Sequence, residues 1–107
     1  MKWYNKHKTN ELTGAALDWA VHIAQGLGDE IYGPYSTSWQ EGGPIIDREI
    51  TLMALNKPDC QATIIQGANA WTAFGPTPLI AAMRCFVASR LGDTINIPAN
   101  WPERSKT

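Results

Sequence analysis

The chain has 107 residues, of which 44% are hydrophobic and 18% are charged, and its formal net charge at pH 7 is −1. This length predicts a single domain over residues 1–107, with 1–10 and 99–107 at its periphery, and the composition excludes a disordered chain. The near-zero charge argues against a nucleic-acid-binding protein, which needs a basic surface, and no apolar run approaches the roughly 18 residues of a membrane span. A reducing cytoplasm is the expected location, with Cys60 and Cys85 as free thiols.

The first third of the chain predicts one helix between two short extended segments. Lys2–Tyr4 is expected to form an edge strand, and Glu30–Tyr32 a second extended piece. Between them, Glu11–Gln25 predicts a helix with Thr13 as its N-cap, because apolar residues recur on one face and glycines follow its end.

The middle of the chain has one clear strand among segments without a regular pattern. Ser36–Pro44 predicts a loop, Ile45–Leu52 fits a strand or a helical turn equally well, and Met53–Asn56 predicts a short helical turn. Cys60–Gln66 predicts a strand, since β-branched residues fill its centre and turn signals flank it. Gly67–Gly75 again predicts a loop.

The stretch Phe74–Gly92 predicts the main helix and contains signals for both of its ends. Thr77 is a suitable N-cap, Pro78 suits the first helical position, and Gly92 suits the residue that closes the last turn. The apolar stripe of this helix is wide enough to be buried, and it comprises Leu79, Met83, Phe86 and Val87. After the helix, Thr94–Ile97 alternates polar and apolar residues and predicts a short strand.

Together these elements predict a small α+β domain in which two main helices pack on a short, mostly antiparallel sheet. The sheet is expected to bury one face against the helices and to have short edges. The last residues, Asn100–Thr107, are expected to form a peripheral tail.

Three segments of the chain carry a resemblance to a known family. They are LTGAALDWAV at Leu12–Val21, YSTSWQEGGPIIDRE at Tyr35–Glu49, and FGPTPLIAAMRCFVASRLGD at Phe74–Asp93. In this order they resemble the NinX-like proteins of lambdoid-type phages and prophages, a domain of unknown function. The resemblance implies a phage or prophage origin and the cytoplasm of the bacterial host as the place of action. It brings no established reaction and no catalytic residues.

Motifs for catalysis are missing from the sequence. It has no phosphate-binding loop, no G-x-S-x-G nucleophile turn and no H-E-x-x-H zinc motif. The two histidines and two cysteines do not have the spacing of a metal site, and His22 is interpreted as a structural histidine on an apolar helix. We therefore expect no catalytic residue, no metal and no cofactor.

The candidate binding site is a set of loop residues near the start of the main helix. Aromatic rings offer stacking surfaces for a flat ligand such as a base, and the helix N-terminus offers N–H groups to a phosphate. The predicted ligand-binding residues are Tyr35, Ser38, Trp39, Arg48, Trp71, Thr72, Phe74, Thr77 and Arg84. Two alternatives remain: the aromatic residues only close the core or form a dimer interface, and Asp47-Arg48-Glu49 is a solvated turn with local ion pairing.

Three functions follow, in order of preference. The first is a non-catalytic phage accessory protein that binds a small nucleotide-like molecule or a host protein, in the service of counter-defence. A homo-oligomer with pockets between its subunits would suit that role, and neither a membrane nor a nucleic acid is an expected partner. The second is a purely structural or protein-interaction module. The third is a small nucleotide- or nucleic-acid-processing enzyme that would use Asp47, Glu49 or a histidine.

Overall fold

The structure is a computed structural model that describes residues 4–26, 33–55 and 59–98. Its elements are β1 (Tyr4–Lys8), the 3₁₀ turn η1 (Thr9–Glu11), α1 (Gly14–Ala24), α2 (Trp39–Glu49), β2 (Leu52–Ala54), β3 (Cys60–Gln66), β4 (Asn69–Gly75), α3 (Pro78–Leu91) and β5 (Thr94–Pro98). This confirms the predicted α+β class. The predicted extended piece Glu30–Tyr32 and the tail Asn100–Thr107 lie outside the described residues.

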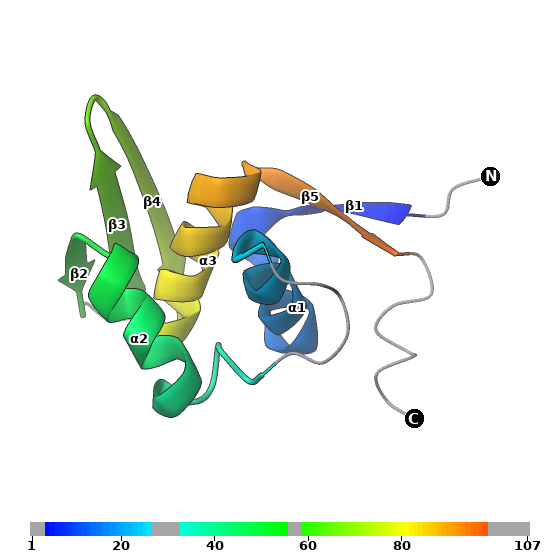
Figure 1. Ribbon diagram of the computed structural model, residues 1–107, viewed down its shortest axis with the longest axis horizontal. Helices are drawn as coiled ribbons and strands as arrows, with labels where there is room; N and C mark the ends of the chain where they lie inside the picture. Colours follow the sequence, from blue (N-terminus) through cyan, green and yellow to red (C-terminus); the bar gives the residue numbers. More distant parts are fainter. Residues whose placement is uncertain (1–3, 27–32, 56–58, 99–107) are drawn as a thin grey trace.

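Helix α3 lies at the centre of the fold (Figure 1). The antiparallel sheet β2–β3–β4 lies on one side of it, and α1 with the antiparallel ribbon β1–β5 lies on the other. Half of its residues are buried, and they are Leu79, Ala81, Ala82, Met83, Cys85, Phe86 and Val87. The predicted apolar stripe is therefore confirmed, but the burial extends around the helix beyond that stripe.

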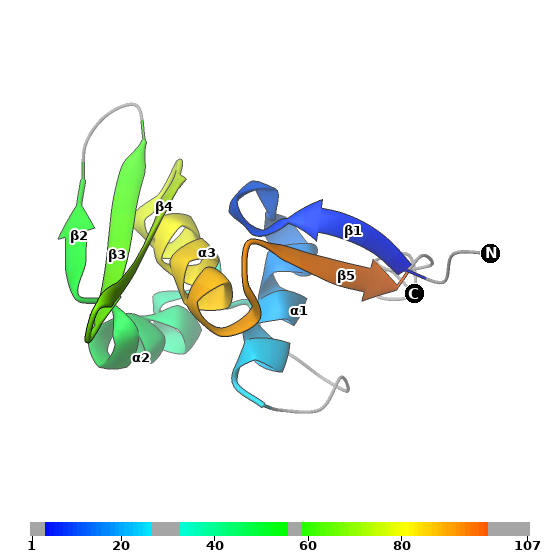
Figure 2. The same ribbon diagram turned by 90° about the horizontal axis from the view of Figure 1, so that it is seen from above.

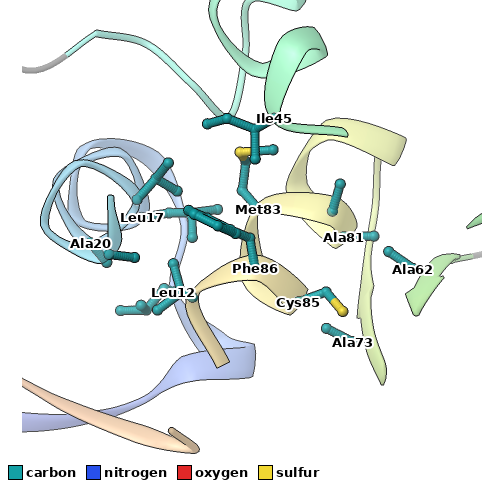
Figure 3. Close-up of a cluster of buried hydrophobic side chains, with 14 of the residues drawn as sticks. Leu12, Leu17, Ala20, Ile45, Ala62, Ala73, Ala81, Met83, Cys85 and Phe86 are labelled. Carbon is teal, nitrogen blue, oxygen red and sulfur yellow. The ribbon is translucent and has the colours of Figure 1, made fainter. Parts of the chain in front are cut away.

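The core consists of side chains that reach α3 from three directions (Figure 3). Phe86 and Met83 point toward Leu17 of α1 and Ile45 of α2. On the opposite side of α3, small residues lie against small residues of the sheet, because short side chains let the helix and the strands approach closely. These residues are Ala81 and Cys85 on α3, and Ala62 and Ala73 on the strands.

Both predicted ends of α3 are confirmed. The Thr77 hydroxyl accepts a hydrogen bond from the Ile80 N–H at 3.1 Å, and Pro78 occupies the first turn. At the other end, the Gly92 N–H donates to the Ala88 carbonyl. The predicted cap of α1 is also at Thr13, although its side chain makes no capping hydrogen bond. Capping chemistry is local, which is why the sequence predicts it well.

Helix α2 corrects the predicted loop over Ser36–Pro44. The helix begins at Trp39 and continues through Pro44 to Glu49, because it buries Ile45 and half-buries Ile46 against the core. A side chain at Gly42 would collide with the Tyr35 carbonyl oxygen and with Leu79 of α3. The glycine that argued for a loop is therefore needed for the close packing of α2 on α3.

The predicted loop over Gly67–Gly75 is also wrong, since most of it is strand β4. Gln66 and Asn69 pair across a two-residue turn, and Gly67 has a φ of 60°. A positive φ at the first central position is what a type II′ hairpin turn requires. The signal was therefore present as a glycine two residues before a second run of strand-forming residues.

Two shorter predictions need correction as well. Met53–Asn56 was expected to be a helical turn, but Leu52–Ala54 forms the edge strand β2. The N-terminal strand runs over Tyr4–Lys8 instead of Lys2–Tyr4, because it pairs in register with β5. With α2 added, the described residues contain three α-helices and two separate sheets, where the sequence predicts two main helices and one sheet. The predicted strand Thr94–Ile97 is confirmed as β5.

The three-stranded sheet buries only one of its faces. Its inner face lies against α3, as the burial of alternate residues in β3 and β4 shows. Its other face, which we name the outer face, comprises Leu52, Ala54, Gln61, Thr63, Ile65, Ala70, Thr72 and Phe74. Leu52, Ile65 and Phe74 are 59%, 47% and 51% exposed, so no described element covers the outer face.

Candidate functional site

The predicted site residues around α2 are spread over both of its ends and the segment before it. Trp39 is in the first turn of α2 and is 57% exposed. Ser38 is the N-cap of that helix without a capping hydrogen bond from its side chain. Arg48 lies in the last turn of α2, where its Nε donates to Glu49 Oε2 at 3.0 Å. Tyr35 precedes α2, and its hydroxyl oxygen lies 3.2 Å from His22 Nδ1 of α1.

The predicted aromatic residues of β4 point to opposite faces of the sheet. Trp71 is half-buried on the inner face and packs against the core, whereas Phe74 is on the outer face. Trp71 lies near the β3–β4 turn, which Figure 1 shows at the top of the molecule, whereas α2, whose first residue is Trp39, begins at the bottom. The structure therefore does not bring Trp39 and Trp71 together.

Thr72, Phe74 and Arg84 do come together, at the edge of β4 that β3 leaves free. Arg84 projects from α3, and its Nε donates to the Leu12 carbonyl at 2.7 Å while Nη1 donates to the Phe74 carbonyl at 2.8 Å. Burial lowers the pKa of Arg84, and the charges of Asp59 and Glu11 oppose that shift. Arg84 thus joins the end of η1 to β4 and leaves part of its guanidinium facing solvent.

Two hollows flank Arg84 along this edge. The larger has a volume of about 340 Å³ and is lined by Lys8, Thr9, Asn10, Thr72, Ala73, Arg84, Ala88, Asp93 and Thr94. The smaller, of about 130 Å³, is lined by Asn10, Asp59, Phe74, Gly75, Pro76 and Arg84. Because Asn10 and Arg84 belong to both, the hollows form one surface that we name the β4 groove. Thr77, which caps α3, follows directly after Pro76 at its end.

The backbone of β4 presents unpaired groups to this groove. Gln66 and Asn69 close the hairpin, so alternate residues from Asn69 onward exchange hydrogen bonds with β3. The other residues of β4 direct their N–H and C=O groups to the free edge, and they are Ala70, Thr72 and Phe74. The Phe74 carbonyl already accepts from Arg84. Within the described part of the chain, the backbone N–H and C=O of Thr72 form no backbone hydrogen bond on this side.

The sequence prediction missed the other wall of the β4 groove. Lys8, Thr9 and Asn10 come from the N-terminal segment, which pairing with β5 carries next to β4. The Thr9 hydroxyl is buried and donates to the Gly92 carbonyl at 2.6 Å, while the Thr9 N–H donates to the Asp93 carbonyl at 2.7 Å. No local signal in the sequence relates residues 8–10 to residues 92–93, since the contact is made only in the tertiary structure.

A buried polar cluster joins α1 to the segment before α2. Asp18 Oδ1 accepts a hydrogen bond from the Ser36 N–H at 2.7 Å, and His22, one turn further along α1, faces Tyr35. Burial raises the pKa of Asp18, although the hydrogen bonds from Ser36 act in the other direction. This cluster positions the start of α2, and it agrees with the interpretation of His22 as a structural histidine.

The pKa shifts of Cys85 and Glu49 run opposite to those that a nucleophilic thiolate and a general acid need. Burial raises the pKa of the Cys85 thiol to about 11, so its nucleophilic thiolate is disfavoured. Burial would raise the pKa of Glu49, but hydrogen bonds and charges from Arg48 and Arg90 outweigh it and lower that pKa. A general acid at neutral pH needs the opposite shift. In residues 4–26, 33–55 and 59–98, no cluster of three or more histidine, cysteine or acidic side chains could hold a metal ion.

The fold and the groove thus define a class of protein: a small α+β domain with an open, polar groove beside a free strand edge. The family model described as "Bacteriophage P22, NinX" matches residues 28–90, which is more than half of the chain. The chain therefore belongs to this family of phage proteins, as the resemblance in its sequence predicts. A comparison with curated proteins found no match. Among the described helices, none has the length and apolar character to cross a membrane.

Proposed function

We propose that this phage accessory protein is non-catalytic and acts by binding an extended segment of a bacterial host protein in the β4 groove. The observation that carries the proposal is the free edge of β4, whose Thr72 N–H and C=O face a hollow of about 340 Å³. An exposed strand edge binds an extended peptide through main-chain hydrogen bonds, which add one strand to the sheet. Hollows of this size also accommodate small ligands.

The charges around the β4 groove suit a polar peptide better than a polyanion. Lys8 and Arg84 are positive, whereas Asp59 and Asp93 are negative. Phosphate groups would be attracted to the first pair and repelled by the second. A peptide with side chains of both signs has no such conflict. The groove therefore supports a protein partner more than the nucleotide-like ligand of the sequence hypothesis.

A nucleotide-like ligand remains the second candidate, because one observation favours it. Phe74 and Arg84 line the smaller hollow together, so a flat ring and a cation are available on the same surface. The other predicted aromatic residues, Tyr35, Trp39 and Trp71, line neither hollow and do not contribute to this surface. Sequestration of a signalling molecule in counter-defence would use such a site, and it would require one ligand per subunit.

The experiment that tests the proposal removes one main-chain donor and leaves the fold intact. Thr72→Pro deletes the N–H that faces the free edge, where proline is tolerated because it breaks no bond to β3. Thr72→Val is the matched control, since it keeps the N–H and the size of the side chain. Both variants and the unmodified protein are immobilised and exposed to lysate of the bacterial host. We expect the unmodified protein and Thr72→Val to capture a host protein. Thr72→Pro should capture at least about tenfold less of it, because one hydrogen bond is lost and the proline ring blocks the strand edge.

Equal capture by Thr72→Pro and Thr72→Val would contradict strand addition in the β4 groove. Ala70→Pro is the second variant, because Ala70 is exposed and also directs its N–H to the free edge. Native mass spectrometry of the purified protein separates the two candidates. A nucleotide-like molecule released at one per subunit would favour the second candidate over the first.

A further inference from the structure

We propose that the outer face of the sheet β2–β3–β4 is the surface on which a second copy of this chain docks. Three large apolar side chains are exposed there: Leu52 on β2, Ile65 on β3 and Phe74 on β4. The strand register places Leu52 beside Thr63, Ile65 beside Ala70, and Phe74 beside Gln61. The three apolar side chains therefore surround the centre of the face, one on each strand. Three large apolar side chains on one sheet face offer surface that a docked partner would remove from water.

The two hydroxyl groups at the centre of the outer face form a pair. Thr63 and Thr72 face each other across β3 and β4, and their hydroxyl oxygens are 3.0 Å apart. Each hydroxyl already has a partner, so the cost of removing it from water is reduced. At the margin of the face, the Ile65 N–H is likewise satisfied, because it donates to Thr51 Oγ1 at 3.0 Å.

The charge pattern identifies a second copy as the occupant. None of the eight outer-face positions carries an ionisable side chain, although 18% of the chain is charged. In a symmetric dimer the same patch meets itself, so any charge near the axis would meet a like charge. A face without charges avoids this repulsion, and a net charge of −1 adds little repulsion at long range. A different protein partner would more often be selected by complementary charges, which the outer face does not offer.

The size of the outer face predicts a weak dimer. Three strands about 4.8 Å apart, with three rows of side chains about 6.7 Å apart, have a footprint of roughly 300 Å². A stable interface buries about 800 Å² on each partner. Side chains that rise above the footprint increase the contact area, but it stays below that of a permanent dimer. We therefore expect a monomer–dimer equilibrium with a Kd on the order of 10 µM or weaker.

Sedimentation equilibrium over a range of protein concentrations tests this inference. Leu52→Glu and Ile65→Glu each place a carboxylate on the outer face, and both sites are exposed, so the fold should persist. Leu91→Glu is the matched control, because Leu91 is also exposed but lies at the end of α3, on another surface. We expect dimerisation of the unmodified protein and of Leu91→Glu, and a Kd raised at least about tenfold in the two outer-face variants, since a buried charge without a partner is costly.

Two results would overturn the inference: a protein that stays monomeric at millimolar concentration, or a loss of dimerisation in Leu91→Glu equal to that in Leu52→Glu. Backbone amide chemical shifts recorded at high and low concentration give an independent measurement. The outer-face inference predicts shifts that change on β2, β3 and β4 and not on α1. Leu52 and Ile65 do not line the β4 groove, so Leu52→Glu and Ile65→Glu test the outer face without changing a residue of the groove.

Discussion

The two sides of α3 differ in how much of their surface is available to partners. On one side, β2–β3–β4 turns one face to α3 and leaves the outer face and the edge of β4 open. On the other side, α1 buries Leu17, Ala20, Val21 and Ala24, and the ribbon β1–β5 buries Ile95 and Ile97. Figure 2 shows the two sides separated by α3. The family match at residues 28–90 covers the sheet side and nearly all of α3, and it leaves out β1, α1 and β5. Both of the surfaces proposed for partners thus include the sheet, whereas the other side mainly completes the core.

The largest expected effect comes from the two phenylalanines of the chain, one in the core and one on the outer face. Phe86 is fully buried between α3 and α1, whereas Phe74 is 51% exposed. Phe86→Ala should lower the free energy of unfolding by about 3–5 kcal/mol, because it leaves a cavity. Phe74→Ala should cost less than about 1 kcal/mol. Denaturant unfolding monitored by circular dichroism measures both, and similar costs would contradict the division into a core side and an open side.

The next effect concerns the polar contact on the α1 side. Asp18→Ala leaves the buried Ser36 N–H without its acceptor, so we expect a loss of about 1–3 kcal/mol in the free energy of unfolding. Asp18→Asn is the control, because its side-chain oxygen can still accept from Ser36. If Asp18→Ala is as stable as Asp18→Asn, the contact does not hold α1 to the start of α2.

The Asp18→Asn variant also tests a pH dependence. Burial raises the pKa of Asp18 above its unfolded value near 3.9 (about that of model peptides). The carboxyl therefore contributes stability that is present below about pH 4 and is lost as the pH rises through its folded pKa. Relative to the unmodified protein, Asp18→Asn should gain stability between roughly pH 3 and pH 7. A difference that is constant with pH would contradict the raised pKa.

Helix capping gives a smaller effect that compares the two sides directly. The side chain of Thr77 caps α3 by accepting a hydrogen bond from the Ile80 N–H. Thr13 is at the same position of α1, but its side chain makes no capping hydrogen bond. Thr77→Ala should lower the free energy of unfolding by about 1 kcal/mol, and Thr13→Ala should lower it by roughly 0.3 kcal/mol. Thermal unfolding of both variants checks this order, and a larger loss in Thr13→Ala would show that the two caps are wrongly assigned.

The smallest effect is expected for the two ion pairs of Glu49, one within α2 and one that joins α2 to the end of α3. Glu49 accepts from Arg48 and Arg90 at 3.0 Å each, but the two arginine side chains are 54% and 42% exposed. Solvent weakens such pairs, so Glu49→Gln should cost roughly 0.2–1 kcal/mol at neutral pH. The arginines lower the pKa of Glu49. The stability that the ionised carboxylate contributes is therefore present above about pH 4.3 and is lost as the pH falls through the folded pKa.

The pH dependence of Glu49→Gln should thus have the opposite sign to that of Asp18→Asn. In acid, the free energy of unfolding of the unmodified protein should fall toward that of Glu49→Gln. In acid, the difference in stability between the unmodified protein and Asp18→Asn should become small. Unfolding of the three proteins in the same buffers between pH 3 and pH 7 measures both signs in one series. Parallel curves for the two variants would show that Asp18 and Glu49 do not differ in environment.

The elements that could be predicted from the sequence are those whose signals are local. Thr77, Pro78 and Gly92 mark the ends of α3, and the β-branched run of Cys60–Gln66 marks β3, because capping and strand preference depend on neighbours in the chain. Of the predicted site, Arg84 and Thr72 were chosen from sequence and do meet in the β4 groove. Their meeting follows from the position of α3 directly after β4.

The features that depend on contacts between distant segments could not be predicted from the sequence. Helix α2 forms over glycines and a proline because Ile45 is buried against the core and Gly42 allows close approach to Leu79, and no neighbouring residue signals either contact. The separation of Trp39 from Trp71 and the arrival of residues 8–10 beside β4 have the same origin. Burial and strand pairing are gains shared between distant segments, so they can override local preference at places that the local sequence does not mark.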